Sequence, residues 1–272
     1  MVEHYQPTSL KEALEIRASK TVVPYGGGTD LMIEANENVT YLFLNKVCDM
    51  CKIYEDAEYI HIGAACTYEK ILSSSIVPQI LKEAVSQIAA PAIRNLGTMG
   101  GNIGNGSAKA DSALICFVVD AKLVLASVNG TRIVNIDEFY LGRKKLDLAE
   151  NELITEILIP KQDLSNYCYS KVGARNALAI SRVSFGGVLV LKDGKISNVS
   201  CAFGAVADTV LRFKELEKML IGKTIAEASA IKQDFLSAYA ASIVPIKGRV
   251  SIEYRKAVCM NLLGDFLSKN NI

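Results

Sequence analysis

The chain has 272 residues, half of them hydrophobic, which is enough for a sizeable core in one large domain or two smaller ones. Its 30 basic and 29 acidic residues give a formal net charge of +1, so the charge does not favour nucleic acid or an anionic membrane surface as a partner. No apolar stretch approaches the roughly 20 residues of a membrane span, and the N-terminus lacks the pattern of a secretory signal. We therefore expect a cytoplasmic protein without a nucleic-acid or membrane partner.

The seven cysteines are an odd and scattered set, which is typical of reduced thiols and not of a disulfide framework. Cys48-Asp-Met-Cys51 has the spacing of a redox or metal motif. No second pair accompanies it, so we expect no metal site.

Helix and strand patterns alternate from the N-terminus. Ser9 is expected to cap a first helix, and Thr67 a helix over residues 68–72. The strands expected in this part of the chain cover residues 21–25, 41–44 and 59–62. This mixture predicts an α+β or α/β fold.

The middle of the chain holds a long stretch without apolar periodicity. Residues 91–110 are rich in glycine and lie between two apolar elements, a helix over residues 78–90 and a buried helix over residues 111–119. Irregular segments of this length inside a compact domain are usually functional or disordered, and the apolar flanks favour a functional role. A hairpin of residues 122–127 and 131–136 and a strand over residues 154–159 follow.

The charged stretch over residues 143–152, together with Lys161-Gln-Asp, marks the expected domain boundary. We predict one domain over residues 1–160, with subdomains of about 1–55 and 56–160, and a second over residues 161–272. The elements predicted for the second domain are a strand over residues 167–172, a hairpin of 183–191 and 195–203 that turns at Asp193-Gly194, and helices over 211–220, 225–241 and 249–267.

Two glycine-rich stretches carry the candidate binding chemistry. The first is Gly26-Gly27-Gly28-Thr29-Asp30-Leu31 after an expected strand, and consecutive glycines allow backbone N–H groups to bind phosphate oxygens. It lacks the lysine of a Walker A loop and the glycine spacing of a Rossmann motif, and a tight turn is an alternative. The second stretch, residues 96–107, interleaves glycine with short polar side chains, and a flexible surface loop is the alternative there. Two separate polar cradles suit a dinucleotide better than a single phosphate.

These motifs resemble those of a known family, the medium, FAD-binding subunits of molybdenum hydroxylases such as xanthine, nicotinate and carbon monoxide dehydrogenases. The family's Ala-Gly-Gly-Thr-Asp-Leu is similar to residues 26–31, and its Arg-Asn-X-Gly-Thr-Ile-Gly-Gly-Asn-Ile matches residues 94–103 nearly throughout. The resemblance implies an α+β, two-subdomain FAD-binding module of the vanillyl-alcohol-oxidase and carbon monoxide dehydrogenase type. A C-terminal antiparallel sheet with helices would follow.

The resemblance also implies a set of cofactor-binding residues. The first motif would line the pyrophosphate and adenosine, the second the diphosphate and ribityl chain, Asp111 a sugar or ribityl hydroxyl, Leu153 or Ile154 the isoalloxazine ring, and Lys171 the polar edge of the flavin. The complete set is Pro24, Tyr25, Gly26, Gly27, Gly28, Thr29, Asp30, Leu31, Thr98, Gly101, Asn102, Gly104, Asn105, Ser107, Asp111, Leu153, Ile154 and Lys171. The family commonly has Ser-Pro before the aspartate, whereas this chain has Ser107-Ala108-Lys109, which is expected to loosen that loop.

The function implied is that of a non-covalent FAD subunit that accepts electrons from 2Fe–2S clusters and passes them to an acceptor, often NAD. A molybdenum-cofactor subunit and a small 2Fe–2S subunit would be partner chains, because this chain has no cysteine pattern for clusters. No catalytic acid or base is expected in it. The alternatives are a stand-alone flavin reductase of the same fold and an assembly protein that has lost FAD.

Overall fold

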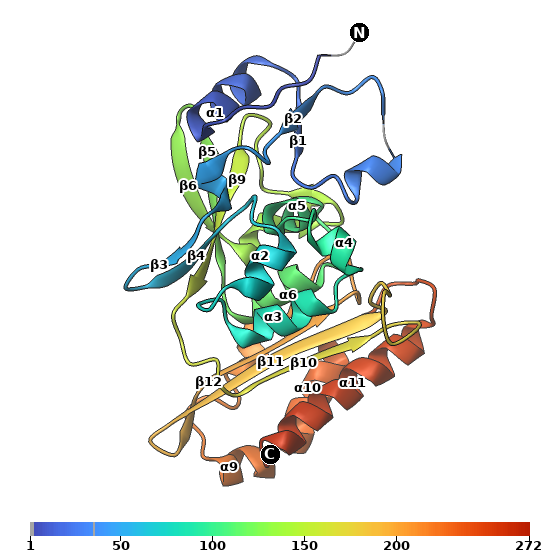
Figure 1. The fold of residues 1–272 in the computed structure, drawn as a ribbon. Helices are drawn as coiled ribbons and strands as arrows, with labels where there is room; N and C mark the ends of the chain where they lie inside the picture. The colour runs from blue at the N-terminus through green and yellow to red at the C-terminus, as the bar shows by residue number, and fades with distance from the viewer. Residues whose placement is uncertain (1–2, 35) are drawn as a thin grey trace. The chain divides into compact units, whose positions relative to one another are not determined.

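The computed structural model describes residues 3–34 and 36–272, which form an α+β fold of two compact units (Figure 1). Unit 1 comprises Met1–Val77, Ile88–Gly106 and Asp120–Lys161, and unit 2 comprises Pro78–Gln87, Ser107–Val119 and Gln162–Ile272. The expected α+β class is confirmed. The expected division near residue 160 stays a prediction, since two earlier segments belong to unit 2.

Unit 1 begins with a helix and a pair of parallel strands. α1 (Leu10–Ser19) starts at Ser9, whose side chain accepts a hydrogen bond from the backbone of Glu12. β1 (Val23–Tyr25) pairs in parallel with β2 (Tyr41–Phe43), and the short helix η1 (Leu31–Glu34) lies in the connection between them. The helix and both strands were expected from the sequence.

The larger sheet of unit 1 is antiparallel throughout, with the strand order β3-β4-β9-β5-β6. Its strands are β3 (Ile53–Glu55), β4 (Tyr59–Gly63), β5 (Lys122–Ser127), β6 (Gly130–Asn135) and β9 (Leu153–Pro160). β9 is central and buries Ile157, Leu158 and Ile159, which explains its apolar sequence. The expected hairpin of β5 and β6 is confirmed, whereas β3 was not predicted.

Short helices and one small hairpin complete unit 1. They are η2 (Cys48–Cys51), α2 (Tyr68–Ser73), α4 (Pro91–Arg94), α5 (Met99–Gly104), α7 (Ile136–Phe139), β7 (Tyr140–Gly142) and β8 (Lys145–Leu146). The prediction of one long irregular stretch over residues 91–110 is therefore wrong. Pro91 occupies the first turn of α4, and Thr98 caps α5, so local capping creates helices that have no apolar periodicity.

Unit 2 is built on a four-stranded antiparallel sheet with the order β10-β11-β12-β13. The strands are β10 (Tyr167–Val172), β11 (Val183–Lys192), β12 (Lys195–Gly204) and β13 (Leu211–Arg212). Asp193 and Gly194 both have positive φ, 52° and 74°, at the turn between β11 and β12. The expected C-terminal antiparallel sheet and its hairpin are confirmed.

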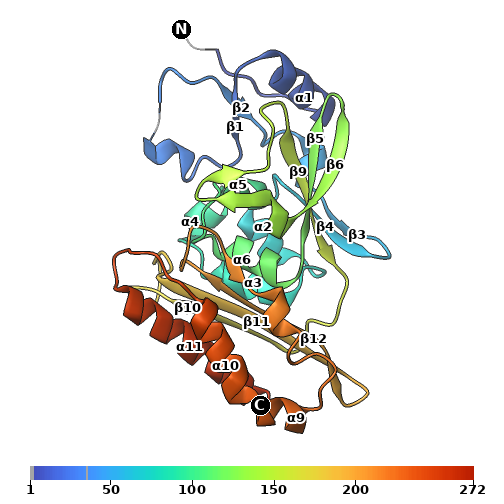
Figure 2. The same ribbon diagram turned by 180° about the vertical axis from the view of Figure 1, so that it is seen from behind.

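Helices cover both faces of this sheet: α3 and α6 lie on one face and α10 and α11 on the other (Figures 1 and 2). The helices of unit 2 are α3 (Gln79–Ser86), α6 (Asp111–Val118), α8 (Lys214–Glu217), α9 (Ile225–Ala230), α10 (Lys232–Ser242) and α11 (Ile252–Lys269). The predicted helix over residues 211–220 is wrong at its start, where Leu211 and Arg212 pair with β12, and the predicted helix over 225–241 is broken at Ile231. Of the helices in the described residues, none is both long and apolar enough to cross a membrane.

Aromatic residues form the centre of the unit 2 core. Phe185 and Phe203 on adjacent strands have ring centroids 5.2 Å apart, and Phe266 of α11 lies 5.6 Å from Phe185. All three side chains are buried, and burial of each contributes roughly 1.5–3 kcal/mol. This core fixes the sheet on which Lys171 lies.

Candidate functional site

The two glycine motifs pack directly against each other in unit 1. A Cβ atom on Gly27 would lie 1.8 Å from the carbonyl oxygen of Leu96, and one on Gly26 would lie 2.5 Å from the hydroxyl oxygen of Thr98. A larger residue would therefore require the backbone at Leu96 to move in the case of Gly27, and the Thr98 side chain to move in the case of Gly26. The structure therefore brings the two predicted loops onto one surface.

The first motif presents backbone amides in a left-handed turn. Pro24 and Tyr25 end β1, residues 26–30 form the loop, and Leu31 begins η1. Gly28 has φ +68°, and the Tyr25 ring lies over it. In the hydrogen-bond network of residues 3–34 and 36–272, the amides of residues 26–29 are not donors. A loop with a left-handed residue and free N–H groups suits anionic oxygens.

The second motif combines buried and exposed glycines. Thr98 accepts a hydrogen bond from the amide of Gly101 at 3.1 Å and thereby caps α5. Gly101 and Gly104 are exposed and three residues apart, so they share one face of α5. Asn102 and Asn105 are half-buried beside them. α5 thus offers a face of bare backbone flanked by two amide side chains.

The start of β9 lies against this face. A Cβ atom on Gly104 would be 3.7 Å from the Cδ1 atom of Ile154. Leu153 and Ile154 are the first residues of β9, and both are buried. The structure therefore places the Ile154 side chain beside Gly104 of the second motif.

In unit 2, Asp111 and Lys171 form a buried ion pair with 2.8 Å between Oδ2 and Nζ. Their side chains are 4% and 9% exposed, respectively, so both charges are largely desolvated. The other Asp111 oxygen accepts a hydrogen bond from Ser181 at 2.7 Å, and Lys171 also donates to the carbonyl of Gln87 at 2.9 Å. Both residues are predicted site residues, and each is held by partners that the sequence did not identify.

The ammonium group of Lys171 keeps binding capacity in this arrangement. It has three N–H donors, and the described residues use two of them. Tyr169 is buried within electrostatic reach of Asp111, and burial together with that negative charge raises the pKa of its hydroxyl. Gln87 and Ser181 carry no recognisable motif, so no sequence signal could have identified them.

Ser107 and the departure after it lie at the start of the second segment of unit 2. The Ser107 hydroxyl accepts a hydrogen bond from the amide of Lys109 at 3.2 Å. The carbonyl of Ala108 accepts one from the amide of Ala205 at 2.6 Å. The first hydrogen bond lies within the loop, and the second connects the loop to Ala205 of the same unit.

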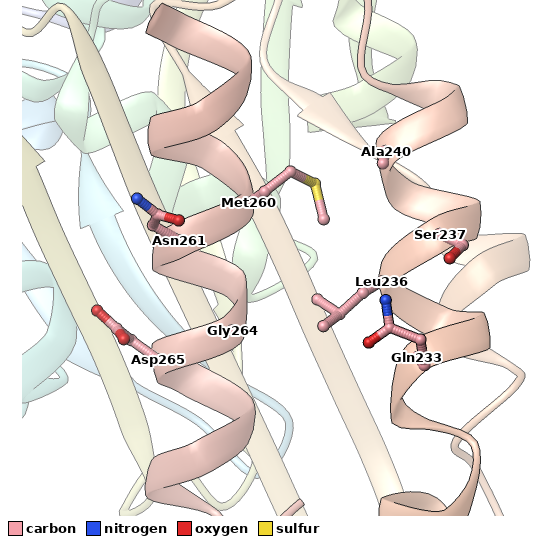
Figure 3. A pocket seen from close by; sticks show the side chains of 8 residues that line it. All are labelled: Gln233, Leu236, Ser237, Ala240, Met260, Asn261, Gly264 and Asp265. Carbon is pink, nitrogen blue, oxygen red and sulfur yellow. The ribbon is translucent and has the colours of Figure 1, made fainter.

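A groove between α10 and α11 is a separate feature of unit 2 (Figure 3). It is lined by Gln233, Leu236, Ser237, Ala240, Met260, Asn261, Gly264 and Asp265. None of the predicted site residues lines it. A Cβ atom on Gly264 would meet no atom within 4 Å.

Comparison with known proteins gives this geometry a family. Residues 1–162 match the model described as "FAD binding domain in molybdopterin dehydrogenase", and residues 167–269 match "CO dehydrogenase flavoprotein C-terminal domain". The chain is 32% identical to the nicotinate dehydrogenase FAD-subunit of Eubacterium barkeri over 81% of this chain and 79% of that protein. It is 30% identical to the xanthine dehydrogenase FAD-binding subunit of Escherichia coli O157:H7, over 79% and 77% of the two chains.

A solved structure supports the same assignment. Carbon monoxide dehydrogenase from Hydrogenophaga pseudoflava that lacks the Mo-pyranopterin moiety contains a chain that matches with a TM-score of 0.89 and 27% identity. The match covers 97% of this chain and 95% of that chain. The expected fold of the carbon monoxide dehydrogenase type is confirmed, and the chain belongs to the family of FAD-binding oxidoreductase subunits of molybdenum-containing dehydrogenases.

Proposed function

We propose that this chain binds FAD non-covalently and transfers electrons from the 2Fe–2S clusters of a partner subunit to an acceptor such as NAD. The complex would include a molybdenum-cofactor subunit that oxidises the organic substrate. The names of the relatives support the FAD part, since they are FAD subunits of nicotinate and xanthine dehydrogenases. The scattered cysteines support a cytoplasmic location and clusters on partner chains.

The observation that carries the proposal is the contact between the two glycine motifs. Gly27 packs on the carbonyl of Leu96, so free amides of the first loop and the exposed face of α5 belong to one surface. Residues 24–31 and 97–106 contain no lysine or arginine, so backbone dipoles would have to compensate the charge of a diphosphate. The residues present therefore fit a dinucleotide.

Each group of residues has a proposed task. Residues 24–31 would hold the pyrophosphate and adenosine, Thr98, Gly101, Asn102, Gly104, Asn105 and Ser107 the diphosphate and ribityl chain, and Asp111 a hydroxyl. Ile154, or Leu153 beside it, would pack against the flavin ring. The third N–H of Lys171 would donate to the polar edge of the ring and favour added negative charge there.

Bound FAD would supply the redox chemistry, which accepts single electrons and donates a hydride. The chain's own task is to bind, orient and shield the cofactor. This division of labour needs no general acid or base from the protein. It agrees with a candidate site made mainly of backbone and amide groups.

The test is FAD binding by the purified chain, measured by flavin fluorescence, with the variants Asn102→Leu and Asn261→Leu. Asn102 is half-buried on α5, whereas Asn261 is exposed on α11 and serves as the control. We expect wild type and Asn261→Leu to bind and Asn102→Leu to lose binding while circular dichroism shows a retained fold. A wild-type chain that cannot bind FAD would refute the proposal.

The electron-transfer part needs the assembled complex. We expect substrate to reduce the flavin in the complex, and NAD to reoxidise it, when both are followed by stopped-flow absorbance. Flavin that stays oxidised although the 2Fe–2S clusters are reduced would contradict the proposed direction. Reoxidation by oxygen or a quinone but not by NAD would refute NAD as acceptor.

A further inference from the structure

A segment of unit 1 that we call the strap, residues 140–154, crosses the C-terminal end of the second glycine motif. It contacts this end at three successive points. The hydroxyl of Tyr140 donates to the carbonyl of Ile103 at 3.1 Å, and the amide of Lys144 donates to the carbonyl of Gly106 at 3.1 Å. Ile154 then packs on Gly104, as described above.

The strap lies directly on the backbone of the motif. Gly106 has φ +60°, and a Cβ atom there would be 2.9 Å from the Cα atom of Lys144. Lys144 itself has a positive φ of 54° at the tip of the β7–β8 hairpin. A close fit of this kind transmits any displacement of the strap to residues 103–106.

One side chain fixes the strap from outside it. Arg132 on β6 donates from Nε and Nη2 to the two carboxylate oxygens of Glu152, at 2.7 and 2.9 Å. It also donates from Nη1 to the carboxylate of Asp147 at 2.6 Å and from Nη2 to the carbonyl of Asp147 at 2.9 Å. A single guanidinium group thus holds the strap at two points, residues 147 and 152. Residue 152 directly precedes β9.

Glu152 passes this constraint to the residues on either side of it. Its side chain is 11% exposed and also accepts a hydrogen bond from the amide of Ala149 at 2.8 Å. Arg17 donates to its carbonyl at 3.4 Å. The hydrogen bonds to Arg132 lower the pKa of Glu152, so the carboxylate stays charged in the clamp. The next two residues are Leu153 and Ile154.

The geometry points to Arg132 and Glu152 as positioning residues that hold the strap, and with it Ile154, against the flavin-ring end of the proposed FAD site. This inference rests on the proposed function. Arg132 is 40% exposed, so its ion pairs contribute little to stability by themselves. Their importance lies in the fixed fork of the guanidinium, which matches a carboxylate bidentately and which lysine cannot reproduce.

The experiment compares Arg132→Met, Arg132→Lys and Glu152→Gln with the control Lys161→Met in FAD titrations. Lys161 pairs with Glu55 in the same unit, and its side chain is 37% exposed, close to that of Arg132. We expect Arg132→Met and Glu152→Gln to raise the Kd for FAD about tenfold, because each substitution removes the charge-assisted hydrogen bonds that hold the strap. Arg132→Lys should raise the Kd less. The control should bind like wild type.

A second readout separates positioning from general destabilisation. At saturating FAD, the visible circular dichroism of the bound flavin should change in Arg132→Met and Arg132→Lys but not in Lys161→Met. Unchanged Kd and unchanged visible dichroism in folded Arg132 variants, even with a lowered Tm, would overturn the inference. If Arg132→Met does not fold, Arg132→Lys and Glu152→Gln decide. Failure of wild type to bind FAD would instead refute the proposed function.

Discussion

The two units hold their candidate site residues by opposite means. In unit 1, Gly26 and Gly27 meet the backbone and side chain of the second motif at distances that leave no space for a side chain. In unit 2, the candidate site residues Asp111 and Lys171 are buried charges that pair with each other, and outside the site Arg212 and Glu217 form a second buried pair. A close approach of two backbones requires residues without side chains, whereas a buried charge requires a specific side chain of opposite charge beside it.

The Arg212–Glu217 pair is the more elaborate of the two in unit 2. The side chains are 6% and 3% exposed, and Arg212 Nε lies 2.9 Å from Glu217 Oε1. Glu217 also accepts a hydrogen bond from the amide of Cys201 at 2.8 Å, and Arg212 donates to Ser200 at 2.9 Å. The pair therefore connects α8 to β12 and β13.

Breaking this pair should give the largest effect. Arg212→Met leaves Glu217 buried without its cation, and we expect a loss of about 3–5 kcal/mol in the free energy of unfolding. Urea denaturation followed by circular dichroism measures it. The matched control is Lys218→Met, whose exposed pair with Glu215 should contribute almost nothing. Equal effects of the two substitutions would show that the buried pair has no special role.

Replacing glycine by alanine should change the stability of the protein in opposite directions at two positions. Gly27→Ala forces the backbone at Leu96 to move, and overpacking of this kind costs about 1–3 kcal/mol. Gly264→Ala in α11 meets no atom within 4 Å and should instead stabilise by about 0.5–1 kcal/mol, because alanine favours the helix. Thermal unfolding of both variants gives the comparison. A Gly27→Ala protein as stable as wild type would mean that the loops do not pack as described.

The smallest effect concerns a charge cluster on the sheet of unit 1. His61 Nε2 lies 3.0 Å from Asp56 and Nδ1 lies 3.1 Å from Glu156, while the ring stacks on Tyr54. Burial opposes the charged ring, but the hydrogen bonds to the two carboxylates outweigh it and raise the pKa of His61 above 6.5. Its stabilising contribution is therefore complete below the unfolded value and is lost as the pH rises through the raised one.

The measurement is the Tm of wild type and of His61→Gln at pH values from about 6 to about 9. The difference between the two proteins should be larger near pH 6 than near pH 9. Asp56→Asn should remove part of the same dependence, since its carboxylate supports the charged ring. A difference in Tm that does not vary with pH would contradict a charged His61 in the folded protein.

Much of the fold followed from local patterns in the sequence. Ser9 and Thr67 cap the helices expected after them, and Asp193-Gly194 turns the expected hairpin. Helices without apolar periodicity, such as α5, could not be found by pattern, because the Thr98 cap and packing on β4 and β9 stabilise them. The break between α9 and α10 at Ile231 could not be predicted either, because the apolar pattern continues through it.

The sequence by itself determined the two glycine motifs, because the succession of glycines and short polar residues can be read directly from the chain. It also supplied the resemblance that led to the family. Only the tertiary structure decided that Gly27 lies on Leu96, that Lys171 is neutralised by Asp111, and that Arg132 clamps the strap. Those contacts join residues far apart in the chain, and no local propensity encodes a distance across the fold.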